Sequence, residues 1–280
     1  MKFVIGSVIA ATLLVWSTPA QASSISFVGT FRNDAFTQTG NGSSLTFQQS
    51  FFSAELDTTV SNPYTTATLT YPGAGSPQNL PQTSPTVYRF QTSGLPSQAA
   101  MDALYPFGTY TFKGVNGGTT DTTSVSYTMD DYPQSLPYLT GTDYTSLQGM
   151  NAAQPFTFHF SPDVTGSTAS NSYIFFTIFD FTKGAFVFND GFLSPSTTSV
   201  TVPANTLTAG DSFAYEVDFS NRDLVPSPGA AFEAQLGFDV RTNGQFAAAP
   251  ATIPEPATLT LTALGLVGVV SRYRRRCASR

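Results

Sequence analysis

Cysteine is almost absent from this chain of 280 residues. The one cysteine, Cys277, lies near the C-terminal end, and the body before it has none. This absence excludes disulfide bonds, a thiolate nucleophile and a zinc site with cysteine ligands from the body. The body must therefore be stable through its hydrophobic core alone, and roughly 228 residues, from 23 to 250, are enough for one large or two small domains.

Histidine is equally scarce, with a single residue. His159 alternates with phenylalanines in Phe156–Phe160, which predicts that its side chain stands alone on the solvent side of a strand. A catalytic histidine needs a nucleophile and a carboxylate, and the chain holds no Gly-Xaa-Ser-Xaa-Gly segment. One histidine cannot supply the usual zinc ligands. We therefore expect a non-enzymatic protein without a metal or other cofactor.

Basic residues are scarce outside the two ends of the chain. Six of the 12 basic residues lie in the terminal segments described below, whereas all 18 acidic residues lie between Asp34 and Glu255. The part from residue 23 to Glu255 therefore carries a net charge of about −12, compared with −6 for the whole chain. Such a negative field disfavours nucleic acid and anionic membranes as partners.

The N-terminal segment, residues 1–22, has the features of a secretory signal peptide. A short basic start, Met1-Lys2, is followed by an apolar run from Phe3 to Trp16. Ala20 and Ala22 then form an A-x-A cleavage site, and cleavage is expected after Ala22. The sequence therefore predicts export across a membrane.

The C-terminal segment, residues 251–280, has three consecutive parts. Pro254-Glu255-Pro256 precedes an uncharged predicted helix at 257–271, and a basic tail follows at 272–280. At about 1.5 Å per residue, the 16 uncharged residues from Pro256 to Ser271 reach roughly 24 Å, less than a hydrocarbon core of about 30 Å. The positive-inside rule places the tail in the cytoplasm and the body on the far side. An ordinary membrane anchor is the alternative, but an anchor does not need Pro-Glu-Pro.

This order resembles the PEP-CTERM sorting tag of exosortase substrates in Gram-negative bacteria. The resemblance implies that an exosortase-type membrane transpeptidase recognises Pro254, Glu255 and Pro256. It also implies a stop-transfer role for four arginines of the tail, which are Arg272, Arg274, Arg275 and Arg276. The protein would be held transiently in the inner membrane, cleaved, and delivered to the cell surface or the extracellular space.

Alternation of apolar and polar residues dominates the body and predicts strands. Phe213–Phe219 and Phe232–Val240 each place apolar residues on one face only, as half-buried strands do. Tyr173–Phe181 is apolar on both faces, which predicts a central strand covered on both sides, and Lys183-Gly184 predicts a hairpin turn after it. Helix is expected only at Ser97–Tyr105, with Ser97 as the N-cap.

These patterns predict an all-β fold of one or two antiparallel β-sandwiches, followed by the short C-terminal transmembrane helix. Pro133 and Pro137 suggest a boundary between one sandwich at 23–133 and a second at 134–250. A single larger sandwich or jelly roll is the alternative. Residues 197–215 resemble the strand, Leu-Xaa-Xaa-Gly turn and next strand of fibronectin type III and related sandwiches. The strand B tryptophan of that fold is missing, so the resemblance implies only the sandwich.

Candidate ligand sites are few. Tyr132, Tyr138 and Tyr144 lie in loop-like sequence and are candidates for stacking on a sugar, although packing of these loops onto the sandwich is the alternative. Acidic residues at Asp130-Asp131 and between Asp218 and Asp223 are candidates for calcium, but no Asp-Xaa-Asp-Xaa-Asp-Gly loop is present.

Three function classes remain from the sequence. The first is a non-enzymatic surface or extracellular-matrix protein, which the resemblance associates with exopolysaccharide and biofilm. The second is a carbohydrate-binding module in that matrix. The third is a secreted hydrolase, which would need a pair of partly buried carboxylates in a cleft.

Overall fold

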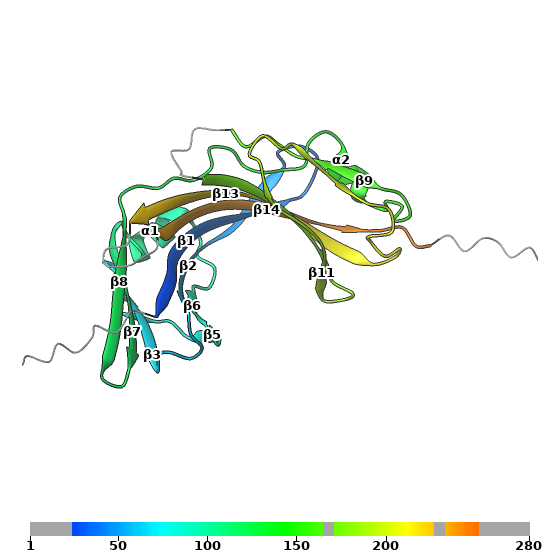
Figure 1. The fold of residues 1–280 in the computed structure, drawn as a ribbon. Coiled ribbons are helices and arrows are strands. Elements are labelled where there is room, and N and C mark those ends of the chain that lie inside the picture. Colours follow the sequence, from blue (N-terminus) through cyan, green and yellow to red (C-terminus); the bar gives the residue numbers. More distant parts are fainter. Residues whose placement is uncertain (1–23, 165–170, 227–232, 252–280) are drawn as a thin grey trace, which may run out of the picture.

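The computed structural model describes residues 24–164, 171–226 and 233–251. Strands dominate, as the alternating pattern predicted. Eight of them form the largest sheet: β1 (Ile25–Gln38), β2 (Leu45–Thr58), β5 (Gln82–Ser84), β6 (Val87–Gln91), β10 (Asn171–Asp180), β11 (Ala185–Leu193), β13 (Ser212–Pro226) and β14 (Glu233–Ala247). Their order is β11-β10-β13-β14-β1-β2-β6-β5, and the sheet bends into an arch (Figure 1).

One pair in this sheet departs from the predicted antiparallel arrangement. β1 and β14 run parallel, with Gly29 opposite Gln235 and Thr37 opposite Asn243. All other strand pairs of the described sheets are antiparallel. No short hairpin joins β1 to β14, so no turn forces them to be antiparallel.

Two smaller layers pack on the outer side of the arch (Figure 1). The first is a four-stranded sheet of β4 (Gln78–Asn79), β3 (Thr66–Thr70), β7 (Gly108–Asn116) and β8 (Thr119–Tyr127), accompanied by α1 (Gln98–Leu104). The second is a two-stranded sheet of β12 (Ser199–Val202) and β9 (Phe156–His159), accompanied by α2 (Asp143–Leu147). The architecture is therefore sandwich-like at two places along one sheet.

Each smaller layer encloses its own hydrophobic core. The first core contains Phe52 of β2, Phe112 of β7 and Phe238 of β14. The second contains Phe158 of β9, Phe176 of β10 and Phe246, which also belongs to β14. β14 therefore passes through both cores and links them covalently.

The predicted boundary near residue 133 does not coincide with a break in the large sheet. Strands from both sides of residue 133 join at the β1–β14 pair. Gln38, at the end of β1, accepts hydrogen bonds from the Tyr215 hydroxyl at 2.7 Å and the Leu139 backbone amide at 2.8 Å. The first predicted range thus contributes a polar side chain to the second core, and the two cores share one sheet.

Local predictions hold where turn and cap chemistry is strong. The Ser97 side chain accepts a hydrogen bond from the Ala100 amide and caps α1. Gly184 has φ +65° and turns β10 back into β11. The run at 197–215 forms β12, a turn and the start of β13, with Leu207 buried in the second core.

The prediction for Tyr173–Phe181 is wrong in one respect. Ile174, Phe176 and Ile178 are buried in the second core, but Phe175 and Phe179 on the opposite face are only half-buried. This strand, β10, is therefore covered on one side only. None of the described helices is both long and apolar enough to cross a membrane. The predicted helix at 257–271 lies outside the described residues.

An arginine, Arg32, occupies the core side of β1. Its side chain is 0% exposed. The Nη1 atom lies 2.5 Å from Asp102 Oδ1 and 3.4 Å from Asp130 Oδ1, and Nη2 donates to the Tyr105 carbonyl. The guanidinium carbon lies 4.9 Å from the centre of the Tyr127 ring. Arg32 therefore ties the large sheet to α1 and to the segment after β8.

Candidate functional site

The inner side of the arch is the second face of the large sheet, and we call it the open face. Because side chains alternate along a strand, the residues between the core positions lie on it. They are largely polar on β13 and β14: Glu216, Asp218, Arg222, Asp239, Arg241, Asn243 and Gln245. The smaller layers lie on the other side of the sheet (Figure 1), so neither of them covers this face.

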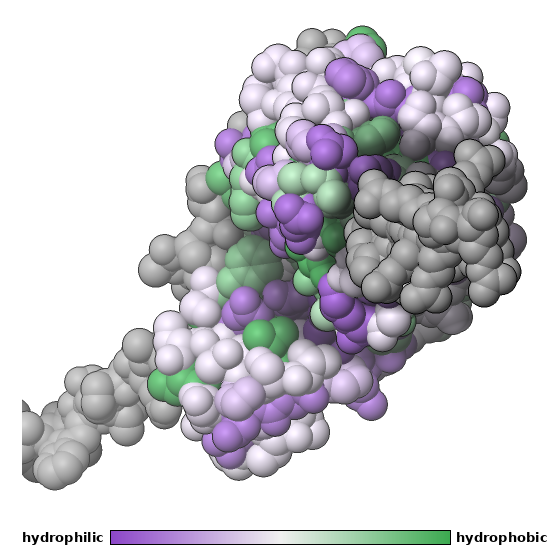
Figure 2. All heavy atoms as spheres, turned by 90° about the vertical axis from the view of Figure 1, so that its right-hand side faces the viewer, coloured by the Kyte–Doolittle hydropathy of each residue, from purple (hydrophilic) through white to green (hydrophobic). Residues whose placement is uncertain are grey.

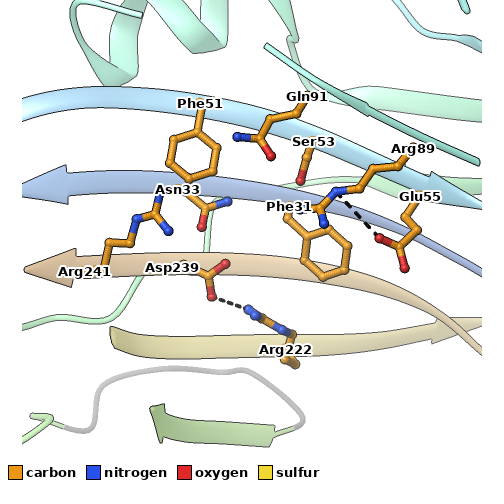
Figure 3. Close-up of a pocket in the computed structure, with 10 residues that line it drawn as sticks. All are labelled: Phe31, Asn33, Phe51, Ser53, Glu55, Arg89, Gln91, Arg222, Asp239 and Arg241. Carbon is orange, nitrogen blue, oxygen red and sulfur yellow. Dashed lines mark hydrogen bonds and ion pairs between the residues drawn. The ribbon is translucent and has the colours of Figure 1, made fainter. Parts of the chain in front are cut away.

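A recess of about 270 Å³ occupies the part of the open face formed by β13, β14, β1, β2 and β6. We call it the arginine recess. Figure 3 shows its lining residues, which are Phe31, Asn33, Phe51, Ser53, Glu55, Arg89, Gln91, Arg222, Asp239 and Arg241. Three of the six basic residues between 23 and 250 therefore lie in one recess.

Acidic partners and aromatic rings already engage these arginines. Arg222 Nη1 lies 2.5 Å from Asp239 Oδ1, and Arg89 Nε lies 3.7 Å from Glu55 Oε2 (Figure 3). The guanidinium of Arg222 lies over Phe31, with 5.2 Å between the guanidinium carbon and the ring centre. The arginines of the recess therefore already have acidic or aromatic partners. Little ring surface is left free for a ligand to stack on.

Carboxylates gather at the centre of the open face. Burial raises the pKa of Asp218 well above its ordinary value, and the negative charges of Asp239 and Glu216 raise it further. Burial also raises the pKa of Glu216, although Arg241 opposes this shift from 3.8 Å. These two carboxyl groups therefore keep their protons to a higher pH than ordinary carboxyl groups do.

Asp57, on the same face, has a raised pKa that should make the stability of the fold depend on pH. Burial and the nearby Glu55 raise the pKa of Asp57 to about 6. Because the folded state then binds a proton more tightly than the unfolded state, stability should fall as the pH rises from about 4 to about 6. We expect Asp57→Asn to raise the free energy of unfolding by about 1 kcal/mol at pH 7, after allowance for solvent screening, and to leave it unchanged near pH 4. Urea denaturation at both pH values measures this, and an equal gain at both would contradict it.

A second hollow, of about 400 Å³, lies on the open face next to the arginine recess. We call it the phenylalanine groove. Its lining residues are Thr177, Phe179, Phe181, Phe186, Ala214, Tyr215, Glu216, Arg241, Asn243 and Gln245. Arg241 lines both hollows, so they adjoin. Figure 2 shows hydrophobic and hydrophilic residues intermixed on the side of the molecule that lies to the right in Figure 1.

The structure does not bring the three predicted sugar-contact tyrosines together. Tyr132 packs on Phe238 of the first core, with 5.5 Å between ring centres. Tyr144 packs against the second core. Tyr138 lines a separate hollow of about 540 Å³ beside Phe36 and Leu136. Two of the three tyrosines thus pack on cores, which matches the alternative of loop packing.

The predicted calcium positions do not form a cluster. Asp130 faces Arg32 at 3.4 Å. Asp218 and Asp223 belong to β13 rather than to a loop, and their odd separation places them on opposite faces of the strand. Within residues 24–164, 171–226 and 233–251, no group of three or more histidine, cysteine, aspartate or glutamate side chains is placed to hold a metal ion.

His159 is solvent-facing, as predicted, with 57% of its side chain exposed. It does not stand alone, however. Its ring Nδ1 lies 3.0 Å from Asp143 Oδ2, and its backbone amide donates to the same oxygen at 2.7 Å. The contact joins β9 to the start of α2 and so serves the second smaller layer. The strand pattern gave no sign of it, because Asp143 lies 16 residues earlier in the chain.

The processing residues predicted from the two ends lie outside the described residues. They are Ala20 and Ala22 at the signal cleavage site, Pro254, Glu255 and Pro256 of the sorting motif, and Arg272, Arg274, Arg275 and Arg276 of the tail.

Sequence reasoning missed the open face and its two hollows. The arginines and phenylalanines that line them are scattered from Phe31 to Gln245, and only strand pairing brings them together. One signal was present in the sequence. Tyr173–Phe181 is apolar on both faces, and one of those faces forms part of a surface groove instead of a second core.

Residues 252–276 match the family described as PEP-CTERM protein-sorting motif, which confirms the resemblance of the C-terminal segment. The motif implies processing by an exosortase and delivery to the cell surface or the extracellular space of a Gram-negative bacterium. No curated protein matches the chain.

Among solved structures, the chain is similar to the chicken CNTN1 FN1–FN3 domains, at 11% identity and a TM-score of 0.25, covering 80% of this chain and 71% of that one. It is also similar to the BSP domain of a biofilm associated protein, at 13% identity and a TM-score of 0.21, covering 81% of this chain and 30% of that one. A third similar structure is trypsin-activated alpha-2-macroglobulin from Escherichia coli, at 9% identity and a TM-score of 0.24, covering 80% of this chain and 16% of that one. Similarities of this size carry no information about function.

Proposed function

We propose that this chain is a non-enzymatic extracellular-matrix protein that associates with exopolysaccharide after exosortase processing. The observation that carries the proposal is the sorting motif at 252–276, placed directly after a β-rich body. The motif accounts for delivery. The open face of the large sheet supplies a surface on which the delivered body can hold a ligand.

The pairing of three carboxylates on the open face with arginines supports binding rather than catalysis by those three groups. A glycosidase needs one carboxyl group as acid and a second as nucleophile or base, each free to act on the glycosidic bond. Here Asp239 is paired with Arg222, Glu55 with Arg89 and Glu216 with Arg241. Paired carboxylates serve well as fixed hydrogen-bond acceptors.

The sorting step is tested by replacing Pro254, Glu255 and Pro256 with alanine. We expect the variant to stay in the inner membrane with its basic tail attached, because the exosortase no longer recognises it. Cell fractionation with antibodies against the body and against an epitope at the tail measures both properties. Normal release of the variant would contradict processing through this motif.

A matched control separates recognition from membrane retention. Replacing Arg274, Arg275 and Arg276 with lysine keeps the positive charge of the tail. This variant should still stop in the membrane, so its topology should match that of the parent chain. A change in topology would show that the tail acts through more than its charge.

The carbohydrate-binding alternative is favoured by one observation. The phenylalanine groove combines exposed rings with polar side chains on a rigid sheet. Aromatic and polar groups in one groove are the two components that a sugar ring needs, and none of Tyr132, Tyr138 and Tyr144 lines this groove.

A further inference from the structure

We infer that the phenylalanine groove binds an uncharged polysaccharide chain, with sugar rings lying against Phe179, Phe181 and Phe186 and sugar hydroxyls bonded to the polar floor. The inference deepens the proposed association with exopolysaccharide and rests on it.

The wall of the groove consists of three phenylalanine rings that support one another. Phe179 lies 5.6 Å from Phe181 and 5.3 Å from Phe186 between ring centres, both edge to face. Phe181 is 50% exposed and Phe186 is 66% exposed. Phe181 follows β10, whereas Phe186 lies on β11 across the hairpin turn at Gly184. The turn therefore fixes the spacing of the wall, and its rings remain open to solvent.

The floor of the groove is built from cross-strand rows. Thr177 of β10, Glu216 of β13 and Asn243 of β14 lie opposite one another in the sheet register. The next row places Phe179, Ala214 and Gln245 side by side. Adjacent rows lie two residues apart, or roughly 6.6 Å along the strands. The floor thus presents one hydroxyl, one carboxylate and two amide groups, which together both donate and accept hydrogen bonds.

Ala214 leaves room between the wall and the floor. It has the smallest side chain in its row and lies between Phe179 and Gln245. A larger side chain at this position would point into the hollow, because alternate residues of β13 face the open side. The volume of about 400 Å³ is within the range of small-ligand sites.

Charge balance favours an uncharged glycan over an anionic one. The two charged residues of the groove, Glu216 and Arg241, lie 3.8 Å apart and offset each other. Asp239, also on this face, is paired with Arg222 at 2.5 Å, so this pair adds no free positive charge beside them. The body as a whole is strongly acidic, so an anionic polymer would be repelled. In contrast to the rings of the arginine recess, no arginine lies over the phenylalanines of the wall among the described cation–π contacts.

The test is affinity electrophoresis of the exported protein in native gels that contain polysaccharide. Uncharged probes are hydroxyethylcellulose, a galactomannan and dextran, and alginate is the anionic probe. We expect at least one uncharged probe to retard the protein and alginate to have no effect. Phe186→Ala should weaken binding by about tenfold or more, the loss typical of an exposed aromatic anchor.

Two further variants make the outcome specific to the groove. Ala214→Arg should block binding while all three rings stay in place. Met129→Ala also removes a large exposed apolar side chain, but Met129 follows β8 and does not line the groove, so binding should be unchanged. Circular dichroism of each variant should match that of the parent protein.

The outcomes separate this inference from the function on which it rests. Retardation that survives both Phe186→Ala and Ala214→Arg would show that the glycan does not bind in the groove, but it would not contradict the proposed matrix function. Retardation by alginate alone would overturn the uncharged class. No retardation by any probe, together with no association with the cell's own exopolysaccharide, would contradict both the glycan site and the proposed matrix function. A sedimentation coefficient that falls on Phe186→Ala, with glycan binding unchanged, would assign the rings to a second copy of the chain instead.

Discussion

Replacing Arg32 with alanine should lower the free energy of unfolding by about 3 to 5 kcal/mol, the cost of breaking a buried ion pair. The substitution removes the cation that Asp102 and Asp130 share and the donor to the Tyr105 carbonyl. Burial already raises the pKa of Asp130, and Arg32 opposes that shift. Without Arg32 the pKa should rise further, so the loss of stability should be larger at pH 7 than near pH 4.

Chemical denaturation of three variants tests this prediction. Arg32→Met keeps much of the volume beside Tyr127 and Phe107 and should recover part of the loss. Arg89→Ala is the matched control, because Arg89 also faces a carboxylate but is 46% exposed, and it should cost less than about 1 kcal/mol. Arg32→Ala with a loss as small as that of Arg89→Ala would contradict the structural role of Arg32.

Replacing Phe238 with alanine should lower the free energy of unfolding by about 3 to 5 kcal/mol and should weaken both cores together. Phe238 is fully buried in the first core. The centre of its ring lies 5.9 Å from that of Tyr127 and 5.5 Å from that of Tyr132. The same strand, β14, continues to Phe246 in the second core. One shared sheet therefore predicts one cooperative unfolding transition.

Hydrogen exchange of backbone amides measures this coupling. In the Phe238→Ala variant, amides of β10 should exchange faster by the same free energy as amides of β2, although β10 lies in the second core. Faster exchange in β2 alone, with β10 unchanged, would show that the two cores unfold independently and would support the predicted division near residue 133.

The sequence predicted the strand content, the helix at Ser97–Tyr105 and the turn at Gly184, because these depend on neighbours within a few residues. It did not predict the parallel pairing of β1 with β14, since those strands lie about 200 residues apart and no local signal specifies their pairing. For the same reason, the sequence pattern suggested two separate domains where the structure has two cores on one sheet. Each has its own alternating strands, and only the long β13 and β14 reveal that they share a sheet.

The candidate site was less accessible to sequence reasoning than the fold. Tyrosines in loop-like sequence were chosen for sugar contact, but Tyr132 and Tyr144 serve to pack loops onto the cores. The exposed rings are instead phenylalanines around the β10–β11 hairpin. Apolar residues on both faces of a strand predict burial on both sides, and only the tertiary arrangement shows that one side is open.

We propose that the delivered body associates with exopolysaccharide through the open face. The most direct measurement is the fate of the mature protein when the extracellular matrix of its own cells is fractionated. We predict that it sediments with the polysaccharide, that Phe186→Ala moves it to the soluble fraction, and that Met129→Ala does not. A mature protein that stays soluble in the presence of its own matrix would contradict the claim.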